Sequence, residues 1–170
     1  MLKKALALGS AVGLGMTLVT GITAQATSPL GKDESVQTLT FQDKDTSGHF
    51  SDTPPKSDSP GDSYQFAEDV YSHGKKVGWV VGQATIIRTV KKSGKLYSEY
   101  VSETVTAHLP GGLISFSGAG YAKVADEDSD TTDTLAITGG TGAYQDARGQ
   151  ATDTDTSETT DTVVITLITG

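Results

Sequence analysis

The sequence of 170 residues contains no cysteine and no asparagine. Without cysteine no disulfide can form, so packing or the association of subunits has to stabilise the folded chain. Without asparagine there is no acceptor site for N-glycosylation. Beyond its N-terminal segment, the sequence also lacks an amphipathic helical period and any apolar run long enough to span a membrane. The missing helical period favours a fold built from strands and turns.

Several motifs of catalytic and metal sites are missing as well. There is no GxSxG motif, and His49, His73 and His108 lie far apart, without the spacing of metal ligands. The acidic run at 126–130 lacks the glycine and the glutamate that an EF-hand loop requires. A solvated hairpin loop is the favoured interpretation of this run, and a weak extracellular cation site is the alternative. We predict no cofactor and no metal site.

Basic residues are scarce. Lysine and arginine total 13 against 21 acidic residues, and the net charge is −8. With Lys3 and Lys4 removed, 11 basic side chains stand against 21 acidic ones, a net charge of −10. Such a charge argues against binding to nucleic acid or to anionic membranes, whose phosphates it would repel. It favours a soluble protein that acts on neutral or cationic small molecules.

The N-terminal segment has the pattern of a secretory signal peptide. Lys3 and Lys4 precede an apolar stretch at 5–22, and an A-x-A cleavage site follows at 24–26. The apolar stretch is broken by four glycines and no stop-transfer charges follow it, which favours cleavage over a membrane anchor. We therefore predict a secreted, extracellular protein. Its expected organisation is a signal peptide at 1–26, a flexible leader at 27–35 and one domain at 36–170.

The domain is expected to be all-β. Residues 36–41 alternate between apolar and polar, which predicts a strand. Residues 42–62 contain three prolines and predict a long loop, as in a binding-site lid or a mobile surface segment. Further strands are predicted at 64–71, 77–90, 95–108, 113–124, 133–138, 150–156 and 161–169. Short strands joined by hairpin-type turns indicate an antiparallel barrel or sandwich.

Both faces of the strand predicted at 77–90 are apolar. One face carries Trp79, Val81 and Ile87, and the other carries Val80 and Ile86. In a small closed barrel one of these faces fills the lumen, so the other has to be covered by a subunit or a loop. Burial of each large apolar side chain contributes roughly 1.5–3 kcal/mol, which favours covering them. The pattern thus predicts oligomerisation.

A glycine-rich stretch at 136–149, AITGGTGAYQDARG, follows one of the predicted strands. It has neither the GK[ST] sequence nor the βαβ context of a phosphate-binding loop. It resembles the GGTG-x-aromatic-x-x-ARG motif of the dirigent and allene-oxide-cyclase-like barrel superfamily, including its secreted bacterial members. The stretches at 61–71, 76–78 and 109–118 agree with this superfamily in order and spacing, and the resemblance covers roughly 36–170.

The resemblance implies an eight-stranded antiparallel β-barrel and a homotrimer. It also implies a lumen that binds a hydrophobic or aromatic small molecule. Catalysis would then be a cyclisation or the stereochemical steering of a reactive intermediate without a cofactor, so an enzyme of this kind would be a cyclase or isomerase. A lipocalin-like binding barrel or a structural barrel without chemistry is the alternative.

Asp43 and Arg148 are the predicted catalytic residues. The resemblance implies an acidic residue at the end of the first strand, inside the barrel mouth, and an arginine after the glycine turn. Asp43 could then transfer a proton, and Arg148 could polarise a carbonyl or pair with Asp43 across the lumen. The alternatives are a solvated turn aspartate, with Asp45 as a neighbour that could take its place, and a structural ion pair of Arg148.

Glu68, Tyr97 and Tyr100 are the predicted ligand-binding residues. Glu68 and Asp69 fall on opposite faces of their strand, so at most one of them points inward. In the strand predicted at 95–108, Tyr97, Glu99 and Glu103 share one face and Tyr100 lies on the other. An outer face of alternating charge and hydroxyl groups is the favoured alternative for this strand. Tyr144 is predicted to lie in the core beneath the glycine turn.

Overall fold

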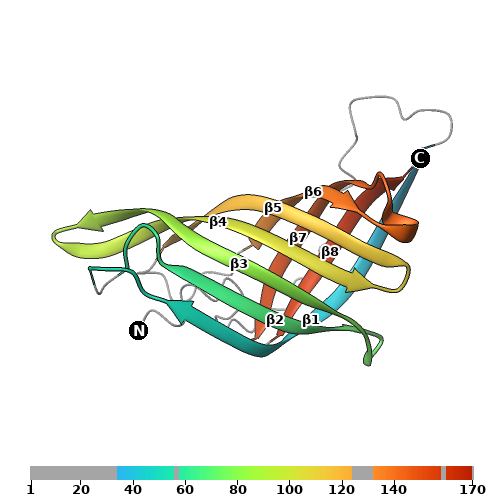
Figure 1. The fold of residues 1–170 in the computed structure, drawn as a ribbon, viewed down its shortest axis with the longest axis horizontal. Helices are drawn as coiled ribbons and strands as arrows, with labels where there is room; N and C mark the ends of the chain where they lie inside the picture. The colour runs from blue at the N-terminus through green and yellow to red at the C-terminus, as the bar shows by residue number, and fades with distance from the viewer. Residues whose placement is uncertain (1–33, 56–57, 124–131, 158–159, 170) are drawn as a thin grey trace.

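The structure is a computed structural model that describes residues 34–55, 58–123, 132–157 and 160–169 (Figure 1). The predicted signal peptide, residues 27–33 of the predicted leader and the acidic run at 126–130 lie outside these residues. Among the described residues there is no helix that is long and apolar enough to cross a membrane.

The described residues form a closed barrel of eight strands. Every strand runs antiparallel to the next, and β8 pairs with β1 to complete the ring. The predicted fold class, an eight-stranded antiparallel β-barrel, is thereby confirmed. The strands are β1 (Ser35–Ser51), β2 (Ser63–Ser72), β3 (Lys75–Lys92), β4 (Lys95–Leu109), β5 (Gly112–Lys123), β6 (Thr132–Gly140), β7 (Arg148–Ser157) and β8 (Thr160–Thr169).

The first strand is much longer than predicted. Residues 42–51, predicted to be loop, continue β1 and pair with β2 from Gln42 opposite Tyr71 to Ser51 opposite Ser63. Their Asp, Ser and Gly content disfavours a strand locally, but pairing with a neighbouring strand overrides this weak propensity. The pairing contains one register shift, a bulge between Asp45 and Ser47.

The loop between β1 and β2 is fixed by Asp62. The Asp62 carboxylate accepts hydrogen bonds from the Thr53 backbone N–H (2.8 Å), the Thr53 hydroxyl (2.7 Å) and the Ser59 N–H (2.9 Å). Burial tends to raise the pKa of Asp62, but these hydrogen bonds outweigh it and lower the pKa. Ile86 on β3 also exchanges backbone hydrogen bonds with Gly61 and Asp62. The described part of the loop is therefore held against the barrel wall.

The glycine-rich stretch closes one end of the barrel, which we call the glycine-turn end. A short 3₁₀ helix, η2 (Gly142–Tyr144), packs on the turn between β4 and β5. The Tyr144 hydroxyl donates to the Pro110 carbonyl (2.8 Å), and the Ala143 N–H donates to the Gly111 carbonyl (2.8 Å). Gly142 has a φ of +63°, and a Cβ there would overlap the Gly111 oxygen, so only glycine fits.

The barrel interior at this end is a continuous apolar core. Tyr144 is buried in it, which confirms its predicted place beneath the turn. The largest fully buried members of this core are Val70, Leu109, Ile114, Ile165 and Leu167. They come from four strands, β2, β4, β5 and β8, so the core ties the barrel wall together.

The two faces of β3 are divided as the sequence predicts. Val80, Ala84 and Ile86 are buried inside the barrel. On the outside, Trp79 is 41% and Ile87 53% exposed, and Val81 between them is also exposed. Oligomerisation, which was inferred from this pattern, stays a prediction.

Candidate ligand site in the barrel lumen

A cavity of about 50 Å³ lies in the lumen, beside the apolar core. This is room for a few water molecules or part of a compact ligand. Most of its lining is aliphatic or aromatic, including Phe41, Phe66 and Phe116. Four acidic residues interrupt the apolar wall. They are Asp43, Glu68, Glu103 and Asp153.

The acidic side chains reach the lumen because they continue apolar inward-facing stripes. Side chains two residues apart in a strand share a face. On β1, Asp43 follows Phe41 at this spacing, and on β2, Glu68 follows Phe66. On β4, Glu103 precedes Val105 in the same way. Each of these stripes therefore passes from apolar residues to a carboxyl group.

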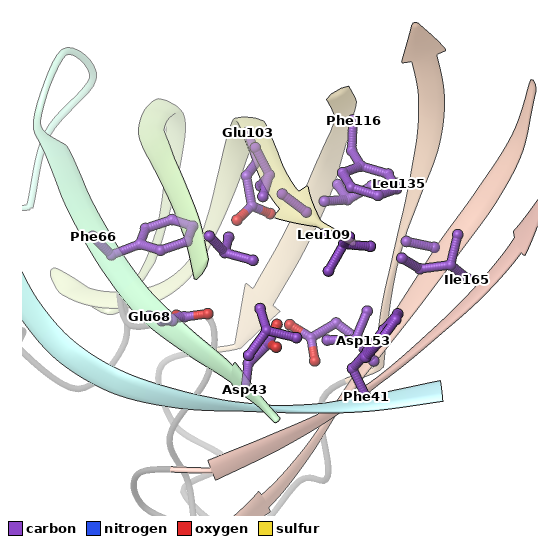
Figure 2. A pocket seen from close by; sticks show the side chains of 16 residues that line it. Phe41, Asp43, Phe66, Glu68, Glu103, Leu109, Phe116, Leu135, Asp153 and Ile165 are labelled. Atoms are coloured by element: carbon purple, nitrogen blue, oxygen red, sulfur yellow. The ribbon is translucent and has the colours of Figure 1, made fainter. Parts of the chain in front are cut away.

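Strand register brings several of these carboxyl groups into one band. Asp43 on β1 lies directly opposite Asp161 on β8, and Glu68 lies opposite Asp45, two residues along from Asp43. Diagonal neighbours of this kind lie roughly 7–8 Å apart, within reach of long side chains. Figure 2 shows Asp43, Glu68 and Asp153 directed into the cavity, with Glu103 facing them from the other wall.

The band is strongly acidic. None of the residues that line the cavity is lysine, arginine or histidine. Asp43 is only 6% exposed, and its Oδ1 atom has no hydrogen-bond partner among the described residues. Buried polar groups in proteins are normally hydrogen-bonded, so an unpartnered carboxyl oxygen facing a cavity is a group available to a ligand.

Burial raises the pKa of three of these carboxyl groups. It raises the pKa of Asp43 to about 7. Burial, reinforced by the nearby charges of Asp43 and Asp45, raises the pKa of Glu68 to about 9. Burial and the charge of Asp133 raise the pKa of Glu103 to about 7. At neutral pH the lumen therefore contains both protonated carboxyl groups, which donate hydrogen bonds, and carboxylates, which accept protons.

The structure brings together two of the predicted site residues, Asp43 and Glu68. Neither Asp43 nor Glu68 is a solvated surface residue, since both line the cavity. Asp69, the neighbour of Glu68, instead forms an ion pair with Lys76 (2.6 Å) and does not line the cavity. The sequence argument that at most one of these two acids points inward is therefore confirmed.

Arg148 lies elsewhere, and its predicted pairing with Asp43 across the lumen is not found. Its half-exposed side chain forms an ion pair with Glu34. Arg148 pairs with Ile168 on β8, which pairs with Val36 on β1. Asp43 lies seven residues further along β1, and at about 3.3 Å per residue this is on the order of 20 Å away. Arg148 thus lies away from the acidic band.

Tyr97 and Tyr100 also lie away from the cavity. The Tyr97 ring lies beneath the Lys92 ammonium group (3.5 Å), and the Tyr100 ring beneath the Arg88 guanidinium group (5.2 Å). These pairs join β3 and β4 toward the hairpin that projects from the barrel (Figure 1). The same strand does send acids inward: Glu99 and Glu103 are buried, so the outer-face interpretation of this strand is wrong for them.

Asp153 and Asp161 were not predicted from the sequence, because both lie in a threonine–aspartate run that reads as a polar strand and turn. A usable signal was present. Asp161 continues the inward stripe of Val163 and Ile165 at a spacing of two, and Asp153 follows Ala151 in the same way.

A closed antiparallel barrel with a few convergent polar groups in an apolar lumen is an architecture of small-molecule-binding proteins. A family model described as "Allene oxide cyclase barrel like domain" matches residues 35–167. The chain belongs to this family. A comparison with curated protein sequences finds no match.

Solved structures with a similar fold include those of a demethylase, a dirigent protein and a Diels-Alderase. A pyocyanin demethylase is 22% identical with a TM-score of 0.62, over 76% of this chain and 100% of that chain. The pterocarpan synthase dirigent protein GePTS1 is 21% identical with a TM-score of 0.60, over 87% and 98% of the two chains. AbnU, an exo-specific intermolecular Diels-Alderase, is 15% identical with a TM-score of 0.58, over 79% and 99%. These likenesses establish the fold.

Proposed function

We propose that this protein is a secreted allene-oxide-cyclase-like barrel that binds a hydrophobic or aromatic small molecule in its lumen. We further propose that it steers the cyclisation or isomerisation of this molecule without a cofactor. The observation that carries the proposal is a buried apolar cavity with acidic side chains in its wall, among them the unpartnered Oδ1 of Asp43. Burying such groups is unfavourable for folding, so their presence points to a use in binding or chemistry.

The lumen carboxyl groups supply paired proton transfer. Glu68 is protonated at neutral pH, because burial raises its pKa to about 9, and it donates to an oxygen or nitrogen of the ligand. Asp43, with a pKa raised by burial to about 7, accepts a proton from the same ligand when ionised. One proton enters the ligand and one leaves, so the net reaction is an isomerisation. Proton exchange with water then returns Glu68 to its protonated form and Asp43 to its ionised form, so no other reactant is needed.

The phenylalanine walls define what fits. Phe41, Phe66 and Phe116 line the cavity and offer ring faces and edges to an aromatic or polyunsaturated ligand. Because the cavity is about 50 Å³, such a ligand is compact, or these rings rotate to admit it. The similar folds of a demethylase, a Diels-Alderase and a dirigent protein support small-molecule chemistry in a barrel of this type.

The alternative function is a lipocalin-like carrier that binds a ligand without changing it. Both functions require that the ligand binds, but only the first converts the ligand into a product. A ligand screen by native mass spectrometry of the secreted protein, followed by incubation of each bound molecule with protein, separates them. Proton-transfer chemistry requires a product of unchanged mass and altered structure, and this product must disappear with Asp43→Asn and Glu68→Gln.

The control for these variants is Asp69→Asn. Asp69 lies next to Glu68 on β2 but pairs with Lys76 and does not line the cavity, so its substitution should leave the reaction unchanged. Binding without any product in the unaltered protein favours the carrier. Binding that survives filling of the lumen by Ala151→Phe contradicts the lumen as the site.

Secretion and assembly complete the proposal. The charged N-region, apolar stretch and A-x-A site of residues 1–26 support export and cleavage, which N-terminal sequencing of the secreted protein tests. The exposed Trp79, Val81 and Ile87 on the outer wall support association into a homotrimer. Analytical ultracentrifugation of the unaltered protein and of Trp79→Ser tests this assembly, and a monomer in both contradicts it.

A further inference from the structure

We propose that the preferred ligand of the lumen is a compact organic cation, such as a positively charged aromatic nitrogen heterocycle, and that its binding expels protons from the acidic band. This inference rests on the proposed lumen site and names the class of molecule that it takes.

The first support is the sign of the charge around the cavity. Every charged side chain that faces it from the described strands is acidic, and β3 and the described side chains of β5 add no charge to the inner wall. The titratable groups that face the cavity or its rim are Asp43 and Asp45 on β1, Tyr64 and Glu68 on β2, Glu103 on β4, Asp133 on β6, Asp153 on β7 and Asp161 on β8. A cation that enters this cavity meets negative potential from several strands, whereas an anion is repelled from all of them.

The second support is the unpartnered oxygen of Asp43. Asp43 is more than nine-tenths buried, lines the cavity, and has one carboxyl oxygen without a hydrogen-bond partner among the described residues. Figure 2 shows this side chain directed into the cavity beside Glu68 and Asp153. An ionised carboxylate in such a place is strongly unfavourable until a positive charge accompanies it.

The spacing of the acids selects an organic cation over a metal ion. A metal ion needs three or more ligand atoms at about 2–2.6 Å from one point. No group of three or more histidine or acidic residues within the described residues converges in this way. Carboxyl groups spread over several strands, at roughly 7–8 Å for diagonal neighbours, instead match a charge distributed over a ring.

The apolar part of the wall matches the rest of such a ligand. Phe41 and Phe66 flank the acidic residues of β1 and β2 at a spacing of two, so aromatic rings and carboxyl groups line the cavity side by side. The negative face of an aromatic ring attracts a desolvated cation. A neutral heterocycle would gain the apolar contacts alone, so the charge itself should add affinity.

Proton expulsion follows from electrostatics. Before binding, the crowded carboxyl groups reduce their mutual repulsion by holding protons. The pKa of Glu68 is raised by burial and by the charges of Asp43 and Asp45. A bound cation favours the ionised form of each group near it, so binding releases protons to solvent. Linkage then requires that the affinity for the cation rise with pH, by up to about tenfold per pH unit for each proton released.

The test uses three probes of similar size: the N-methylquinolinium cation, neutral quinoline and the 2-naphthoate anion. Isothermal titration calorimetry at pH 8 should show N-methylquinolinium binding at least about tenfold tighter than quinoline, with no binding of 2-naphthoate. Equal affinities of the cation and quinoline, or tighter binding of quinoline, would overturn this inference and leave the proposed lumen site standing. Binding of none of the three would overturn both.

Proton release is measured in the same experiment by repeating it in buffers of different ionisation enthalpy. We expect about one proton released per cation at pH 7, and an affinity that rises from pH 6 to pH 8. An observed heat that is the same in every buffer before any correction, together with a pH-independent affinity, contradicts the inference.

Matched variants locate the effect. Asp43→Asn should weaken N-methylquinolinium binding about tenfold at pH 8 and leave quinoline binding within twofold. Asp69→Asn, which removes a charge from the outer side of the adjacent strand, should change neither. An equal loss in both variants would show that net charge alone attracts the cation and would refute a site at the acidic band. The thermal unfolding of each variant confirms that it is folded.

Discussion

The two ends of the barrel interior differ in what their buried side chains do. At the glycine-turn end, Leu109, Ile114 and Leu167 fill the lumen. The Tyr144 hydroxyl there donates a hydrogen bond to the Pro110 carbonyl. Beyond them, the inner wall carries buried carboxyl groups, whose burial is unfavourable for folding. The apolar side chains at the first end stabilise the folded protein, whereas the buried carboxyl groups at the second end destabilise it. The comparison shows that the recognisable motif of the chain belongs to the end that stabilises the barrel.

The motif and the candidate site are therefore separate features. Gly142 and Tyr144 fasten the turn between β6 and β7 onto the turn between β4 and β5, and Arg148 forms a surface ion pair beside them. The acidic residues lie elsewhere on the inner wall, with Asp43 on β1 and Glu68 on β2. A family motif in such a barrel can therefore report the fold while the candidate site lies at other positions.

The largest expected effect is at the apolar end. Ile114→Ala removes a fully buried side chain from the core and should lower the free energy of unfolding by about 2–5 kcal/mol. Thr40→Ala, on the exposed face of β1, should change it by less than about 0.5 kcal/mol. Denaturant titration measures both. A loss below 1 kcal/mol for Ile114→Ala would mean that this end is loosely packed.

At the acidic end the dependence on pH should be opposite to that of ordinary paired carboxylates. The folded-state pKa values of Asp43, Glu68 and Glu103 are raised by burial above their ordinary values. Protonated forms are thus favoured by folding, and this contribution is full below about pH 4 and lost as the pH rises through 7 to 9. The free energy of unfolding should decrease from pH 5 to pH 9.

Glu68→Gln sharpens this test. The variant side chain is neutral at every pH, so at pH 9 it should be more stable than the unaltered protein by about 1–3 kcal/mol. At pH 5 the two proteins should differ less. Guanidinium titrations at both pH values measure the difference, and a variant that is less stable at pH 9 would show that Glu68 is ionised and well solvated.

A smaller effect is expected for the hydroxyl of Tyr144. Tyr144→Phe keeps the buried ring and removes the hydrogen bond to Pro110, so it should cost about 1 kcal/mol. Ligand binding at the acidic end should not change. Altered affinity for a lumen ligand would show that the two ends are coupled.

The smallest effect is expected for Arg148. Its ion pair with Glu34 is exposed, and Arg148→Ala should cost no more than about 1 kcal/mol and leave lumen binding unchanged. Calorimetry with N-methylquinolinium and a thermal melt measure these two quantities. A loss of binding would restore the catalytic role that the sequence predicts for this arginine.

Strand positions could be predicted well from sequence because alternation and turn residues are local properties. The clearest failure was at 42–51, where pairing with β2 makes a strand of residues with low β-propensity. Asp43 could be found because the family resemblance implies an acidic residue at the end of the first strand. Glu68 could be found because alternation along a strand lets at most one of Glu68 and Asp69 point inward. Arg148 was placed wrongly relative to Asp43, since the distance between them depends on strand register around the closed ring, which a single sequence does not encode locally.

The stacking of Trp79 on His108 has a practical consequence. The two rings lie 5.0 Å apart and nearly parallel on the exterior of β3 and β4, and Trp79 is the single tryptophan of the chain. Its emission therefore reports the surroundings of the outer wall. A blue shift with rising protein concentration would signal subunit contact, while a molecule entering the interior would leave the spectrum nearly unchanged.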